Sequence, residues 1–215
     1  MSRKDLESII YDPEQCRRDL AAFKRLLGIR KDLAERADIQ AFFKKRKQLS
    51  AFIGTFAANI GPAPLLGYEF PFMGDFSADI VLGNKETGVF CVIELEDGKP
   101  DSIFKKLPNK STTEWSQRFE HGFSQLVDWF CALDDFKKTE RFARDFGRGH
   151  IQFIALLVLG RNIGLSESDR NRLRWRTEKV RVDSHSIECL TLDDLYQYLE
   201  MRISYYPEAS KLERG

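Results

Sequence analysis

The chain has 215 residues, of which 42% are hydrophobic and 31% are charged, and its formal net charge is +1. These values predict a soluble globular protein with a sizeable core, and they exclude a global positive field that would hold the whole molecule on nucleic acid. No apolar run is long enough to span a bilayer and the charged N-terminus does not look like a secretory signal. We therefore expect a cytoplasmic protein without membrane contact.

The cysteines and histidines show no metal-binding pattern. The four cysteines are scattered without a C-x-x-C pair, and the three histidines lack the spacing of metal ligands. We therefore expect reduced thiols rather than a zinc site or a disulfide framework.

Residues 1–60 are predicted to be a helical segment that packs on the rest of the chain. Helices are expected over 4–10, 13–27 and 32–52 because apolar residues recur there at helical spacing, and Asp12 before Pro13 is typical of a helix start. The basic run KKRK at 44–47 is either a solvated helix face or a patch that faces phosphates. The sequence GPAP at 61–64 breaks the helical pattern, so we place a core over 61–215.

A β-hairpin is predicted at the start of this core, after a strand over 65–72. Its strands are 77–82 and 89–96, which alternate apolar with small or acidic residues around a glycine-bounded turn. Asp79 lies on the first strand, and Glu94 and Glu96 lie on one face of the second.

The pairing of the hairpin decides whether these acids meet. If Leu82 pairs with Val89, Asp79 lies opposite Val92 and Glu94 is diagonal to Asp79 at roughly 7–8 Å. A divalent cation can bridge two carboxylates at this separation. The alternative is a solvated strand face whose acids pair with nearby Lys or Arg, because a buried carboxylate without a partner is costly.

The remaining elements are predicted from their periodicity. A basic loop over 102–113 either lies against phosphates or is solvated, and the helix over 114–133 carries His121 and Gln125 beside its apolar stripe. Gln125 is either a surface amide or reaches the edge of the acidic cluster. The remaining predicted elements are a helix over 138–146, a central buried strand over 151–159, an arginine-rich helix over 166–178, strands over 180–182 and 186–190, and a last helix over 195–203.

The order of these motifs resembles a known nuclease family. An Asp on one strand, Glu94-x-Glu96 on the next and a helix with Gln125 resemble the PD-(D/E)XK nuclease superfamily. An ordered set of runs also resembles Shedu-type antiphage nucleases and covers most of the chain from about residue 35 onward. These runs are ERADIQAFF at 35–43, SAD at 77–79, IELE at 93–96, EHGFSQLVDW at 120–129, VLGR at 158–161 and LTLDDL at 190–195.

The resemblance implies an α/β fold of the restriction-endonuclease type, with a mixed central sheet flanked by helices. It also implies a metal-dependent DNA endonuclease of phage defence, in which Asp79 and Glu94 coordinate Mg²⁺ or Mn²⁺ with a backbone carbonyl near Leu95. Gln125 would orient the strand ends or the attacking water, and Glu35 would be an additional acid. DNA is the implied partner, the family suggests a homo-oligomer, and no organic cofactor is implied.

The chain departs from the family at Glu96, where the family usually has Lys. Some nucleases of the superfamily use Glu at this place, as a base or as a second metal ligand. Lys99 in the following turn is a candidate substitute for the missing Lys, and His121 is an accessory candidate. The departure also permits an alternative, a catalytically inactive nuclease-fold domain that binds nucleic acid or a protein partner. A further alternative is an α/β scaffold without a nucleic-acid role.

Overall fold

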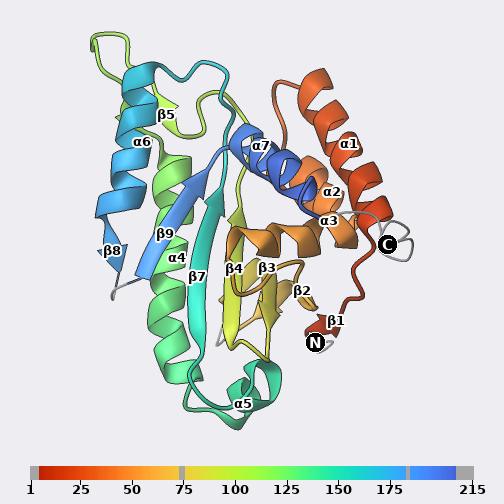
Figure 1. Cartoon of the computed structure of the whole chain (residues 1–215). Helices are drawn as coiled ribbons and strands as arrows, with labels where there is room; N and C mark the ends of the chain where they lie inside the picture. The colour runs from red at the N-terminus through yellow and green to blue at the C-terminus, as the bar shows by residue number, and fades with distance from the viewer. Residues whose placement is uncertain (1–4, 73–75, 183–184, 207–215) are drawn as a thin grey trace.

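A seven-stranded sheet lies at the centre of the structure, a computed structural model that describes residues 5–72, 76–182 and 185–206 (Figure 1). In these ranges the chain is a mixed α/β protein. The strand order is β1 (Glu7–Ser8), β2 (Leu65–Pro71), β3 (Ser77–Asn84), β4 (Val89–Leu95), β7 (Gln152–Val158), β9 (His185–Leu190) and β8 (Arg181–Val182). A separate pair is formed by β5 (Phe104–Lys105) and β6 (Glu114–Trp115).

The central strands explain the nearly unbroken apolar runs of the sequence. Neighbours from β1 to β4 are antiparallel, whereas β4, β7 and β9 are parallel to one another and β8 returns antiparallel. Every residue of β4 is buried, because this strand has a strand on each side and helices over both faces. Glu94 near the end of β4 and Glu96 just after it are therefore buried acids.

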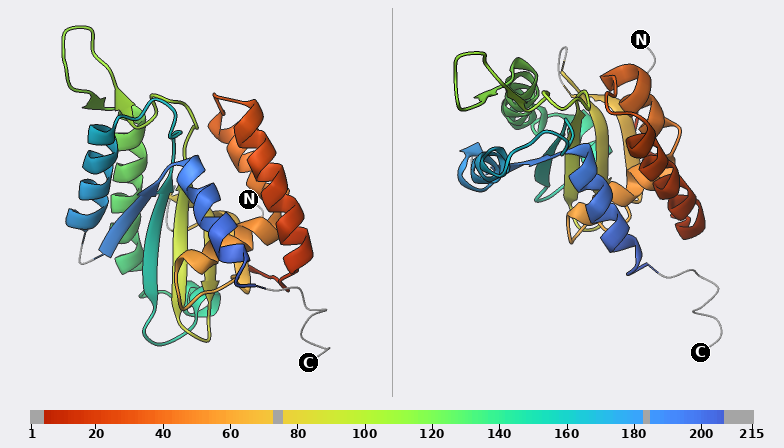
Figure 2. Two further views of the ribbon diagram at one scale, coloured as in Figure 1. Left: turned by 45° about the horizontal axis from the view of Figure 1, so that its top comes forward. Right: turned by 90° about the horizontal axis from the view of Figure 1, so that it is seen from above.

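Helices cover both faces of the sheet, and Figure 2 shows α1 and α7 on one side with α4 and α6 on the other. The first face carries α1 (Pro13–Ile29), the π-helix η1 (Glu35–Gln40), α2 (Ala41–Lys44), α3 (Lys47–Phe52), the 3-10 helix η2 (Ile53–Phe56) and α7 (Leu192–Ile203). The second face carries α4 (Gln117–Phe136), α5 (Glu140–Phe146) and α6 (Glu167–Lys179). Each face has its own apolar core, and α1 shares the first core with β2, β3 and β4. The boundary at residue 60 stays a prediction.

Polar caps mark the helix starts, which lie within one residue of the prediction for α1 and α6 and three residues before the predicted start for α7. Asp12 accepts hydrogen bonds from the backbone N–H groups of Glu14 and Gln15, with Pro13 at the first helical position. Thr191 caps α7 and Ser166 caps α6 through reciprocal capping boxes. The predicted strands over 65–72 and 151–159 are confirmed as β2 and β7, and the two strands of the predicted hairpin as β3 and β4.

Three predicted elements are wrong. The helix over 4–10 is replaced by β1, whose backbone pairs with β2 at the edge of the sheet. The single helix over 32–52 is divided into η1, α2 and α3, with a break at Lys45 and Arg46. The loop over 102–113 contains β5, which pairs with β6, so Trp115 precedes α4 instead of belonging to it. For β1 a long-range backbone pairing overrides the local preference, whereas β5 and β6 pair across a short connection of 106–113.

Candidate functional site

The acids predicted from the hairpin line one polar cavity of about 510 Å³ at the end of β3 and β4. The cavity also receives side chains from η1, β2 and α4, three elements that are far apart in the sequence. Its lining residues are Glu35, Arg36, Gln40, Glu69, Ser77, Asp79, Glu94, Glu96, Arg118, His121 and Gln125.

The hairpin register that brings the acids together differs from the predicted one. Leu82 pairs with Cys91 and Ile80 pairs with Ile93, so the pairing of Leu82 with Val89 is wrong by two residues. The reason is that the first strand continues to Asn84 before the turn. Because side chains alternate with a period of two, this shift keeps every residue on its predicted face. Asp79 therefore lies beside Glu94 rather than diagonal to it.

Asp79 is held by two hydrogen bonds from other elements. Its Oδ2 accepts from the backbone N–H of Leu95 at 2.9 Å, and its Oδ1 accepts from Nε2 of Gln40 at 2.7 Å. Burial raises the pKa of Asp79 to about 6, although the hydrogen bond from Leu95 opposes this shift. The two donors fix the orientation of a carboxylate that has no basic side chain in direct contact within the described residues.

Glu94 is the least compensated acid of the cavity. Its residue is 7% exposed, and it makes no hydrogen bond or ion pair with the described residues. Burial, reinforced by the negative charges of Asp79 and Glu96, raises the pKa of Glu94 to about 10. An ionised carboxylate at this depth is costly without a cation or hydrogen-bond donors.

Glu96, in contrast, has a partner. Its residue is 2% exposed, and Nη1 of Arg118 donates to it at 2.9 Å and to Glu35 at 3.1 Å. Burial raises the pKa of Glu96 to about 7, and the Arg118 guanidinium opposes the shift. Arg118 therefore supplies positive charge beside Glu96.

The other predicted site residues divide into two groups. His121 and Gln125 line the cavity, and Oε1 of Gln125 is buried without a hydrogen-bond partner in the described part of the chain. Lys99 lies outside this cavity, in a neighbouring hollow, where it forms an ion pair with Asp97 at 3.1 Å.

Sequence reasoning missed Gln40 and Arg118. A helical face offered a signal for Arg118, because Arg118, His121 and Gln125 follow one another at spacings of three and four residues. No comparable signal existed for Gln40, which reaches Asp79 across 39 positions from η1. That contact depends on how η1 packs over the sheet.

The donor set fits a hydrated hard cation. No group of three or more His, Cys, Asp and Glu side chains in the described ranges is arranged to hold a metal ion by protein atoms of these types alone. Mg²⁺, however, often uses one or two carboxylates and keeps several water ligands. The adjacent carboxylates of Asp79 and Glu94, with the unpartnered amide oxygen of Gln125, match that chemistry.

Replacing the ionisable carboxyl of Glu94 with a neutral amide is expected to stabilise the metal-free protein, and more so as the pH rises. The pKa of Glu94 is raised in the folded state, so its protonated form contributes stability that is complete below the ordinary pKa of 4.5 and is lost as the pH rises toward about 10. In EDTA, Glu94→Gln should therefore gain roughly 1–3 kcal/mol over the wild type between pH 5 and pH 8. Urea denaturation at both pH values measures the difference.

The control is Glu140→Gln, which removes an exposed carboxylate that pairs with Arg148 on the protein surface. Its stability relative to the wild type should stay nearly constant between the two pH values. The assignment of Glu94 as an uncompensated buried acid is contradicted if the stability gain of Glu94→Gln over the wild type is no larger at pH 8 than at pH 5.

No helix in the described ranges is long and apolar enough to cross a membrane.

Comparison with curated proteins finds no match for the chain. Comparison with protein families gives one match, to the family described as Shedu protein SduA, C-terminal, over residues 32–196. The match covers more than half of the chain and spans every residue of the acidic cavity. The chain therefore belongs to the SduA C-terminal family of Shedu proteins.

Proposed function

We propose that the chain is a metal-dependent endonuclease that hydrolyses phosphodiester bonds of DNA in defence against phage. Membership of the Shedu family suggests the role in antiphage defence. The single observation that carries the enzymatic part is Glu94, a buried acid beside Asp79 whose ionised form no group in the described residues stabilises. A cavity of this kind suits a cation and the negatively charged phosphate that the cation attracts.

Asp79 and Glu94 would hold Mg²⁺ or Mn²⁺ in this proposal. A bound cation of this type supplies Lewis-acid stabilisation of the scissile phosphate and lowers the pKa of an attacking water. Gln40 and the backbone N–H of Leu95 keep the Asp79 carboxylate oriented. Gln125 offers an amide oxygen that accepts a hydrogen bond from water in the cavity.

Glu96 would act as the general base in place of the usual Lys. A carboxylate whose pKa is raised to about 7 holds and releases a proton near neutral pH. Arg118, in contact with Glu96 and Glu35, offsets part of the negative charge that a phosphate brings into the cavity. Glu35 keeps Arg118 in place from the side of η1.

The alternative is a catalytically inactive domain that binds nucleic acid or a protein partner. The Arg118 ion pairs favour this candidate, because they already offset part of the negative charge of Glu96 and Glu35 without a metal ion. In that case the acids of the cavity would be structural and DNA would stay intact.

Incubation of the full chain with supercoiled plasmid separates the two candidates. With Mg²⁺ or Mn²⁺ we expect relaxed circles or linear DNA, and with EDTA we expect none. Retained binding in a gel shift, with an intact plasmid at every metal tested, supports the inactive domain instead.

A further inference from the structure

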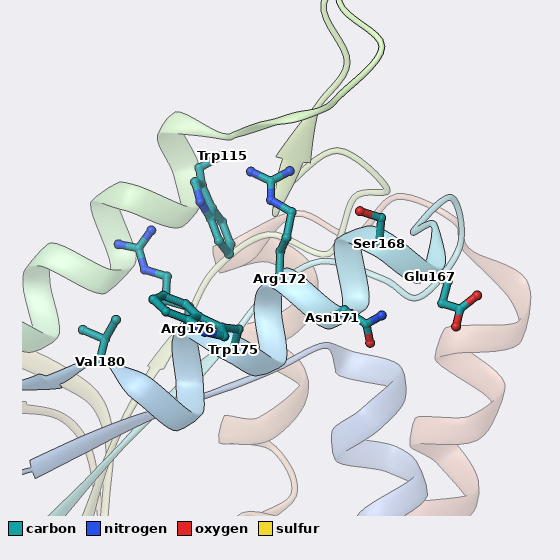
Figure 3. A pocket seen from close by; sticks show the side chains of 8 residues that line it. All are labelled: Trp115, Glu167, Ser168, Asn171, Arg172, Trp175, Arg176 and Val180. Carbon is teal, nitrogen blue, oxygen red and sulfur yellow. The ribbon is translucent and has the colours of Figure 1, made fainter.

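A second cavity, of about 860 Å³, lies against the outer side of α6, and its side chains are not used by the proposed reaction (Figure 3). Trp115 comes from the strand before α4, and Arg172, Trp175 and Arg176 come from α6. The pocket thus combines two indole rings with two guanidinium groups.

The two tryptophans differ in their surroundings. The Trp115 ring is fixed, with its centroid 4.3 Å from that of Phe104 and 4.4 Å from that of Phe119. Trp175 is 61% exposed, and its ring stacks on no ring or cation of the described residues. A rigid aromatic wall therefore stands near an indole whose faces are free to stack on a flat ligand.

Both arginines are held in place by carboxylates and aromatic rings. Arg176 forms a bidentate pair with Glu120, at 2.7 and 2.9 Å, and Nη1 of Arg172 lies 3.6 Å from Asp169. Nη1 of Arg172 donates to the carbonyl and to the hydroxyl of Thr113, both at 2.9 Å, and its guanidinium lies 4.6 Å from the Phe104 centroid. Arg172 keeps its remaining N–H groups for another acceptor. Beside it, the exposed amide of Asn171 has no hydrogen-bond partner within the described ranges.

The pocket is linked to the acidic cavity through shared lining residues. An intermediate hollow shares Trp115 with the α6 pocket and Arg118 with the acidic cavity. Asp97, Asp101 and Glu114 also line it, and Lys99 and Lys110 pair with the first and the last of these acids. Lys105 in this hollow is exposed and forms no ion pair with the described residues. A chain of phosphates could follow this line between the two cavities.

We propose that the α6 pocket binds an unpaired base of the DNA strand whose backbone runs to the acidic cavity. The inference rests on the proposed function and adds that the substrate contains single-stranded nucleotides. Trp175 stacks on the base, the Asn171 amide hydrogen-bonds to its edge, and Arg172 contacts the adjoining phosphate. A duplex does not bind in the pocket, because each of its bases is stacked between neighbouring bases and offers no free face to Trp175.

The test measures binding in EDTA, so that it does not depend on cleavage. The full chain is titrated into a fluorescein-labelled thymidine 20-mer and into a labelled blunt 20-base-pair duplex, and anisotropy is recorded. Trp175→Ala should weaken binding of the single strand about tenfold and binding of the duplex by less than twofold. Met201→Ala, which truncates an exposed apolar side chain on α7, should change neither affinity.

Trp175→Phe keeps a stacking ring and provides a second readout. It should retain single-strand affinity within about threefold, while the quenching of tryptophan fluorescence by the unlabelled 20-mer becomes smaller than in the wild type. The inference is overturned if Trp175→Ala leaves single-strand affinity unchanged or weakens both DNAs equally. It stands, even if plasmid cleavage fails, when the loss is confined to the single strand.

Discussion

Glu94→Gln and Asp79→Asn are each expected to reduce plasmid cleavage at least about a thousandfold in Mg²⁺. Each substitution removes one of the adjacent carboxylates that would hold the cation, and neutral amides are weaker ligands for a hard ion. Glu94→Gln is the cleaner test, since Glu94 has no hydrogen bond to the described residues that the amide would disturb. Initial nicking rates and calorimetric titration with Mn²⁺ measure the two losses together.

The matched control is Arg118→Ala, which changes the cavity without removing a proposed metal ligand. It should keep Mn²⁺ binding but slow cleavage, because Glu96 and Glu35 then lose their common cation. Thermal melting establishes that each variant is folded. Cleavage that survives both Asp79→Asn and Glu94→Gln at wild-type rates would refute the assignment of the site.

Arg161→Ala is expected to lower the free energy of unfolding by about 3–5 kcal/mol. Arg161 is 3% exposed and forms a bidentate pair with Asp193, through Nε and Nη2 at 3.0 Å each. Its N–H groups also donate to the carbonyls of Leu27 and Arg30 at 2.9 and 2.6 Å. The substitution would therefore leave a carboxylate without its cation, and the end of α1 without its donors.

Urea denaturation of the wild type and of Arg174→Ala provides the comparison. Arg174 lies exposed on α6 and forms no ion pair with the described residues, so its removal should change stability by no more than about 0.5 kcal/mol. A loss below about 1 kcal/mol for Arg161→Ala would mean that water replaces these bonds at little cost.

The sequence predicts the central sheet well because its strands carry local signals. The alternation of residues 77–82 and 89–96 and the apolar run at 151–159 follow from burial on one or both faces. β1 and the β5–β6 pair carry no such signal, because strands of two residues are too short to show an alternation. β1 in addition depends on a partner far along the chain. The break at Lys45 and Arg46 likewise depends on how the helices pack over β2.

The candidate site is predictable in part for the same reason. Asp79, Glu94 and Glu96 are placed by the period of a strand, which survives a two-residue error in register. The period does not predict which basic side chain accompanies them. Lys99 is only three residues from Glu96, yet Arg118, 22 residues away, is the one that packing brings into the cavity. Gln40 belongs to a segment whose approach to the hairpin is a tertiary contact.

The position of the π-helix η1 limits how far the N-terminus of the protein can be truncated. It delivers Glu35 and Gln40 to the acidic cavity, and the pairing of Leu33 with Gly98 ties the residues just before it to the turn after β4. A truncated version that starts at residue 61 would keep Asp79, Glu94 and Glu96. It would lose Gln40, which donates a hydrogen bond to Asp79, and Glu35, which pairs with Arg118. A shortened protein that keeps the lining of the acidic cavity must therefore retain η1, and it must also retain α1, which shares the first core with the sheet.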